Sequence, residues 1–256
     1  MSRVYFIWLL FAAIGIFLGG FLSVSGFRWV FLISLVAFLA SLTIILFFKE
    51  ATYSKEASTH KELFLSGLAY IKKKKIVLYI LLFGTLITGI VNSFYRYHSL
   101  YFQQINFSPQ LIGTVFALMY FFAGLSGRIS PWLEKKLGLR ASLFLIPLVL
   151  GTTYIIMGSF PFYLVGFLIF SESVMAGFDD IILLDLRQRQ LDSSKRSTLL
   201  SMQSFSENGM KIIISLFVGF GAAAVSLPFV YVVIGIFMVV AGIFLSGKII
   251  SYLPSR

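Results

Sequence analysis

The chain has 256 residues, of which 59% are hydrophobic and 12% charged, and its mean hydropathy is +0.94. Since a soluble domain is about 25% charged, this composition excludes a soluble globular protein and predicts an all-α polytopic membrane protein. The formal net charge is +11, but Lys and Arg occupy short segments between apolar runs, so we expect no nucleic-acid partner. With no cysteine and two distant histidines, we also expect no metal site and no cofactor.

Eight segments are long enough to cross a bilayer, which takes about 20 mostly apolar residues in a helix. They lie at residues 4–22, 29–48, 76–102, 109–127, 141–159, 161–186, 197–220 and 228–247. The first also fits a signal peptide with Ser23-Val24-Ser25 as its cleavage site. Because this segment can span the bilayer by itself, we interpret it as the first membrane helix.

Positive charge is distributed unequally between the two sets of connections. With a cytoplasmic N-terminus, 18 Lys and Arg residues fall on the cytoplasmic side, including seven in residues 49–75, four in 128–140 and four in 187–196. The opposite loops contain only Arg28. By the positive-inside rule, both termini are cytoplasmic in a multi-pass plasma-membrane protein.

The longest connection, residues 49–75, has a helical pattern of its own. Thr59 and Glu62 form a capping-box pair, and Leu63, Phe64, Leu68 and Ile71 follow at helical spacing before a run of four lysines. One interpretation is an amphipathic helix on the membrane surface with its lysines near anionic lipid headgroups. The other is a solvated linker that ends in a stop-transfer charge cluster.

Polar side chains concentrate in three of the eight segments. In 76–102 they recur every three or four residues and therefore share one helix face. The segment 197–220 repeats this pattern, and in 161–186 Glu172 and Asp179 share a face because they are seven residues apart. The polar residues of the first two segments are Thr85, Thr88, Asn92, Tyr95 and Ser99, and Ser201, Ser204, Glu207, Asn208, Lys211 and Ser215. We expect the three helices to line one polar cavity.

The charges within these helices have structural as well as functional interpretations. Glu207 and Lys211, four residues apart, can form an intrahelical ion pair. Alternatively, Glu172 and Lys211 lie at similar depth and can pair between helices, which leaves Glu207 free to exchange a proton. We expect a structural role for Asp179 and its neighbour Asp180 near the cytoplasmic end.

Arg96 and His98 lie near the outer end of their segment. For both we expect the side chain to extend to the lipid headgroups.

Several motifs resemble those of the major facilitator superfamily. Gly15, Gly19 and Gly20 are similar to the end of that family's antiporter motif, although Ile16 replaces its proline, and Gly15 and Gly19 also have the spacing of a close helix contact. The segment from Gly26 to Leu32 resembles the start of the family's sixth helix. Residues 127–140 resemble its second loop signature, through Gly127, Glu134, Lys135, Gly138 and Arg140. Lys195 to Ser201 resembles the opening of the eleventh helix in many bacterial members.

The resemblance implies a truncated transporter that contains the last eight of twelve helices. Residues 1–48 then end the N-terminal half, 49–75 form the central cytoplasmic loop, and 76–256 form the C-terminal half. A bacterial drug or metabolite exporter is implied, with the lipid bilayer, protons and a small-molecule substrate as partners and a second chain as a source of the missing helices. The alternative is a non-transporting membrane remnant or an interaction subunit.

The expected substrate and proton pathway comprises seven residues of the polar helices. No catalytic triad, phosphate loop or His-Glu-x-x-His motif is present, so we expect no enzyme activity. The pathway residues are Asn92, Tyr95, Glu172, Asp179, Glu207, Asn208 and Lys211.

Overall fold

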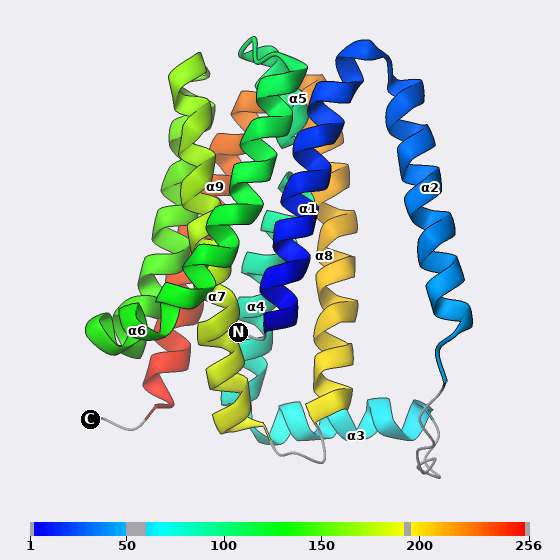
Figure 1. The fold of residues 1–256 in the computed structure, drawn as a ribbon. Helices are drawn as coiled ribbons and strands as arrows, with labels where there is room; N and C mark the ends of the chain where they lie inside the picture. The colour runs from blue at the N-terminus through cyan, green and yellow to red at the C-terminus, as the bar shows by residue number, and fades with distance from the viewer. Residues whose placement is uncertain (1–2, 50–59, 192–195, 254–256) are drawn as a thin grey trace.

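The computed structural model describes residues 3–49, 60–191 and 196–253, and within these ranges the regular structure is entirely helical. The long helices run side by side as a bundle (Figure 1), which confirms the predicted all-α polytopic fold. The helices are α1 (Arg3–Leu22), α2 (Phe27–Leu46), α3 (His60–Lys73), α4 (Lys75–Phe94), α5 (His98–Gln104), α6 (Pro109–Ser159), α7 (Ile169–Gln190), α8 (Arg196–Ala224) and α9 (Leu227–Ser251), with 3-10 turns η1 (Ser23–Ser25) and η2 (Tyr163–Leu168).

Five of the described helices are long and apolar enough to cross a membrane: α1, α2, α4, α6 and α9. Helix α6 includes two predicted spans, 109–127 and 141–159. Helices α7 and α8 occupy two further predicted spans but fall outside this group, because charged and polar side chains lower their hydropathy. These are the helices whose charges we expected to face an interior.

The prediction of a loop at residues 128–140 is wrong for most of this range. Helix α6 continues through it, and only Gly138 leaves the helical conformation, at φ 79° and ψ 154°. This left-handed φ is open to glycine at little cost because glycine has no Cβ. A single glycine therefore makes the turn between two spanning helices, at the bend of α6 in Figure 1.

The predicted helix 76–102 is interrupted between Phe94 and His98. The interruption places two polar aromatic side chains of α5 inside the bundle, where His98 and Tyr101 are fully buried. Tyr101 donates to the carbonyl oxygen of Met157 at 2.7 Å. Such buried bonds offset the backbone bonds that a break in a helix removes.

Helix α1 packs against α6 at a pair of glycines. A Cβ added to Gly20 would lie 2.8 Å from the Cα of Gly113, so only glycine permits this approach. Gly15 and Gly19 have no neighbour within 4 Å of an added Cβ. The close contact therefore lies at Gly20 and not at the Gly15–Gly19 pair. Helix α2, by contrast, has no buried residue and stands apart from the bundle (Figure 1).

Helix α3 lies across one end of the bundle (Figure 1). A Cβ on Gly67 would lie 2.6 Å from the Sδ of Met202, so α3 packs closely on the start of α8. Lys74 anchors its end by donating to the carbonyl oxygen of Gln190 at 2.6 Å. The helix supports the amphipathic interpretation of 49–75, while Thr59 of the predicted capping box lies outside the described residues.

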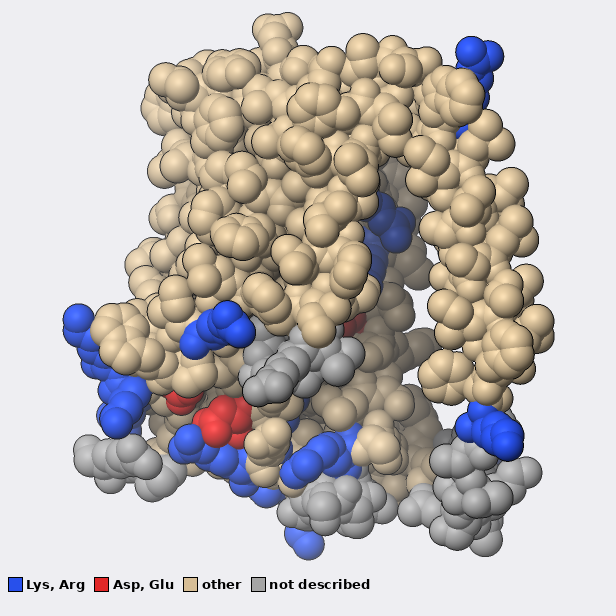
Figure 2. Space-filling view, viewed as in Figure 1, with Lys and Arg blue, Asp and Glu red and all other residues tan. Residues whose placement is uncertain are grey.

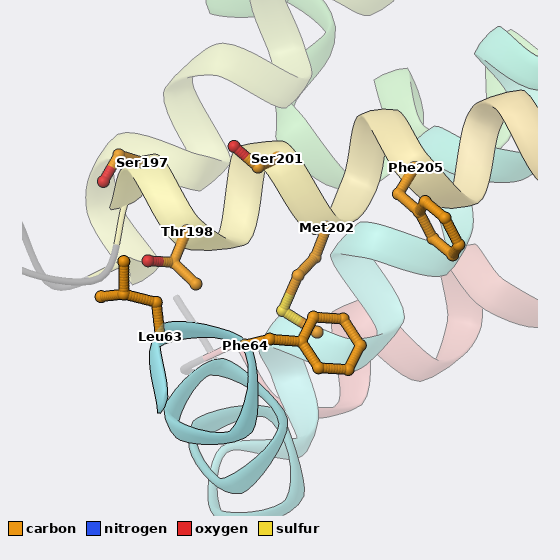
Figure 3. Close-up of a pocket in the computed structure, with 7 residues that line it drawn as sticks. All are labelled: Leu63, Phe64, Ser197, Thr198, Ser201, Met202 and Phe205. Carbon is orange, nitrogen blue, oxygen red and sulfur yellow. The ribbon is translucent and has the colours of Figure 1, made fainter. Parts of the chain in front are cut away.

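A groove of about 410 Å³ lies beside this contact and is lined by both α3 and α8. Figure 3 shows Leu63 and Phe64 of α3 on one side of it and Thr198 and Met202 of α8 on the other. Figure 2 shows that most basic side chains on this face gather in a band at the same end of the molecule as α3. This band lies at the end of the molecule that the charge bias predicts to be cytoplasmic.

Candidate functional site

A cavity of about 340 Å³ lies between α1, α4, α6 and α7. Its polar lining comes largely from the stripe on α4 and the charged face of α7, because both faces turn toward the same interior. Four of the predicted pathway residues line it, namely Asn92, Tyr95, Glu172 and Asp179, together with Trp8 of α1 and Tyr120 of α6.

Glu172 is 2% exposed and is held by a buried hydrogen-bond network. The Tyr154 hydroxyl donates to Oε2 at 2.6 Å, and Nε2 of His98 lies 3.2 Å from both carboxylate oxygens. On its other side, Nδ1 of His98 lies 2.7 Å from the Tyr231 hydroxyl. These bonds stabilise a carboxylate whose burial without partners would cost several kcal/mol, on the order of 3–5.

The network corrects our expectation for His98. Its side chain does not extend to the headgroups but is 0% exposed, between Glu172 and Tyr231. Aromatic rings surround it: the His98 ring centroid lies 5.9 Å from that of Tyr231, 6.1 Å from that of Tyr154 and 6.3 Å from that of Phe102. Sequence patterns missed the two tyrosines because neither Tyr154 nor Tyr231 belongs to a polar stripe that recurs at helical spacing.

Tyr231, His98 and Glu172 form one continuous chain of hydrogen bonds. If the Tyr231 hydroxyl donates to Nδ1, then Nε2 carries the ring proton and donates to Glu172. These hydrogen bonds connect α7 through Glu172 to α5, α6 and α9, which carry His98, Tyr154 and Tyr231.

Neither predicted pairing of Lys211 is present in the described part of the chain. Glu207 Oε1 accepts from Gln203 Nε2 at 2.6 Å, and Lys211 Nζ donates to Asn208 Oδ1 at 3.2 Å. The pairings with Glu207 and with Glu172 are therefore both wrong. Lys211 and Asn208 line a separate cavity of about 470 Å³, together with Arg96.

A second charged group lies where α4, α7 and α8 meet near Gly84. A Cβ on Gly84 would lie 2.6 Å from Gln203 Nε2 and 2.9 Å from an Nη of Arg187. Arg187 interacts electrostatically with Asp179 and Glu207, and neither Asp179 Oδ1 nor Arg187 Nε has a hydrogen-bond partner among the described residues. Sequence analysis placed Arg187 in a loop; its position two helical turns after Asp179 was the signal that could have identified it.

The loop-signature residues lie at the turn between the two halves of α6. Gly127 packs against α7, where a Cβ on Gly177 would lie 3.1 Å from its backbone nitrogen. Glu134 is half-buried near Asp185 and Arg189, whereas Lys135 and Arg140 are exposed. Among the described residues, no cluster of acidic or histidine side chains could hold a metal ion.

Comparisons with known proteins identify the family. Residues 1–206 match the Major Facilitator Superfamily. Comparisons with curated proteins and with solved structures each gave no significant match. Since the family match covers more than half of the chain and the fold is a bundle of long apolar helices, this protein belongs to the Major Facilitator Superfamily of membrane transporters.

Proposed function

We propose that this transporter exports a small molecule in exchange for protons, and that the route passes through the cavity between α1, α4, α6 and α7. Glu172 is the proposed proton-coupling residue. The observation that carries the proposal is its position: the carboxylate lines the cavity and also belongs to the buried network of His98 and Tyr154. Export is supported by the resemblance of the glycine motif to that of antiporters.

The coupling argument depends on what a proton does at this position. An ionised group within a membrane costs at least about 2.5–3.5 kcal/mol, so it needs partners or access to water. Glu172 has both. Ionised, it accepts bonds from groups on α5 and α6; protonated, it loses part of that link and carries no charge. Transporters of this kind operate by movement of packed helices around a central site, which such a link can bias.

Glu207 is the weaker candidate for proton coupling. It does not line the cavity, and its Oε1 already accepts from Gln203. Its proposed role, with Asp179 and Arg187, is to hold α7 and α8 together at the side predicted to be cytoplasmic. Contact between α7 and α8 at this group would also close the proposed route at its cytoplasmic end.

The test is a flux measurement on purified chain in proteoliposomes. We expect Glu172→Gln to lose proton-driven flux to background while substrate exchange at equal concentrations continues, because the amide keeps the volume but cannot bind the proton. Glu62→Gln on α3 is the matched control and should pump like the unmodified chain. Normal driven flux in Glu172→Gln would show that this carboxylate is structural.

An interaction subunit is the second candidate function. It is favoured by α2, whose described residues are all outside the core. A second chain that packs against this helix would cover a mostly apolar surface. Flux by the purified chain alone supports transport; absence of flux together with a stoichiometric co-purifying membrane chain supports the subunit.

A further inference from the structure

We propose that the cavity lined by Arg96, Asn208 and Lys211 binds an anionic group, a carboxylate or phosphate, of the transported substrate. The cavity has a volume of about 470 Å³ and lies between the outer end of α4 and the middle of α8. Its remaining lining consists of Ser215 and two apolar residues, Ile212 and Leu216. That the anion is transported depends on the proposed function, whereas its binding does not.

Two contacts fix the two cationic residues at the same cavity. The Tyr97 hydroxyl, one residue after Arg96, donates to the carbonyl oxygen of Ser215 at 3.4 Å. Lys211 lies one turn before Ser215 on α8 and donates to Asn208. The guanidinium group therefore comes from the turn between α4 and α5 and the ammonium group from α8, and a hydrogen bond joins this turn to α8.

Neither cation has an acidic partner. Among the described residues, no carboxylate oxygen lies within 4.0 Å of either one, and the Arg96 guanidinium makes no hydrogen bond. The nearest acidic residue on α8, Glu207, accepts from Gln203 instead. Figure 2 shows basic side chains in the hollow between the bundle and α2, well away from the basic band at the end of the molecule.

The depth of Lys211 excludes the simple alternative that it extends to the headgroups. It lies near the middle of α8, about 20 Å from either end at 1.5 Å per residue. A lysine side chain cannot cover that distance. A charge at such a depth is expensive unless a counter-charge is present, and no carboxylate of the described residues lies within 4.0 Å to supply one. A bound anion would provide it.

The lining also provides hydrogen-bond donors of the right kind. Arg offers a planar fork and Lys a point charge, both of which bind carboxylates and phosphates strongly. Asn208 uses its amide oxygen for Lys211, so its NH₂ group is left to donate to a ligand. Tyr95 lines the first cavity and its neighbour Arg96 the second, so an anion bound here lies beside the proposed route.

The experiment measures thermal unfolding of the purified chain in a neutral detergent. Inorganic phosphate or succinate is titrated against sodium chloride at the same ionic strength. We expect a saturable rise of the unfolding midpoint, because a ligand that binds only the folded state stabilises it. Arg96→Gln and Lys211→Gln should each weaken apparent affinity by about tenfold to a hundredfold, as expected for loss of a charge-assisted bond.

Two sets of variants serve as controls. Arg28→Gln and Lys248→Gln remove the same charge from exposed positions elsewhere and should bind like the unmodified chain. Asn208→Asp places a carboxylate next to Lys211; it should keep the protein at least as stable in chloride and abolish anion binding. This variant tests the site even if the loss of a cation destabilises the fold.

A second arm separates a soluble anion from a lipid phosphate. The chain is placed in nanodiscs of phosphatidylcholine alone or with phosphatidylglycerol. Stabilisation by phosphatidylglycerol, dependent on Arg96 and Lys211 but without any effect of soluble anions, supports the anion site and overturns the substrate assignment. No saturable effect in either arm, or equal binding by Asn208→Asp, overturns the site. Anion binding without flux supports the site and contradicts the proposed transport.

Discussion

At the scale of one residue, Glu134 makes the stability of the fold depend on pH. It is half-buried at the end of the first half of α6, and burial raises the pKa of its carboxyl above the ordinary value of 4.5. Asp185 raises this pKa further, while Arg189 partly opposes the effect. A carboxyl whose pKa is raised by folding destabilises the fold when it is ionised, at pH values above its folded pKa.

Glu134→Gln should therefore be more stable than the unmodified chain near neutral pH. As the pH falls through the raised pKa, Glu134 becomes neutral and the difference should disappear. Unfolding midpoints measured between pH 4 and pH 8, roughly the range in which such a group titrates, check this prediction. A gap that widens on acidification would contradict the sign of the effect.

At the scale of elements, a single glycine determines how closely α1 packs against α6. Gly19 and Gly20 are adjacent in sequence, but only Gly20 faces the backbone of α6. The distance between the helices is set by this position, because any Cβ would collide with a backbone atom that cannot move independently. The contact also positions Trp8 and Leu9 of α1 along the cavity.

Gly20→Ala should destabilise the protein by about 1–3 kcal/mol, the usual cost of overpacking. Gly19→Ala is the matched control, since its Cβ meets no atom within 4 Å, and it should leave stability unchanged or slightly higher. SDS-induced unfolding in mixed micelles measures both. Equal effects of the two substitutions would show that α1 and α6 are not in close contact at Gly20.

At the scale of the whole molecule, orientation follows from where the basic residues gather. Helix α3 and the basic band occupy one end of the bundle (Figure 2), while η1 joins α1 and α2 at the other (Figure 1). We therefore predict that the basic end lies on the cytoplasmic side of the bilayer, because translocating positive charge is unfavourable. In this orientation we expect the site of Glu172 and the anion cavity to lie within the membrane.

Cysteine labelling checks this orientation directly, and the absence of natural cysteines makes single substitutions sufficient. In intact cells, Ser25→Cys should react with an impermeant maleimide, whereas Ser251→Cys should react only after the membrane is opened. Labelling of both positions from the same side would exclude the predicted topology.

The sequence by itself determined the membrane class, the apolar spans and the polar faces of α4 and α7. Hydropathy and helical periodicity are local properties, so a stretch of residues shows them before any packing is known. Asn92 and Tyr95 were predicted to share a helix face that lines a cavity. The same was predicted for Glu172 and Asp179. The structure places all four on one cavity.

Only the tertiary structure decided which side chains meet. Sequence spacing paired Lys211 with a carboxylate and sent His98 to the headgroups, but packing gives Lys211 an amide partner and buries His98 against Glu172. The His98–Glu172 contact joins residues 74 positions apart in the chain and arises from the arrangement of helices around one another, which no periodicity within a single helix contains. The Lys211–Asn208 contact lies within α8, where the spacing offers both Glu207 and Asn208 as partners and only the structure shows which one is used.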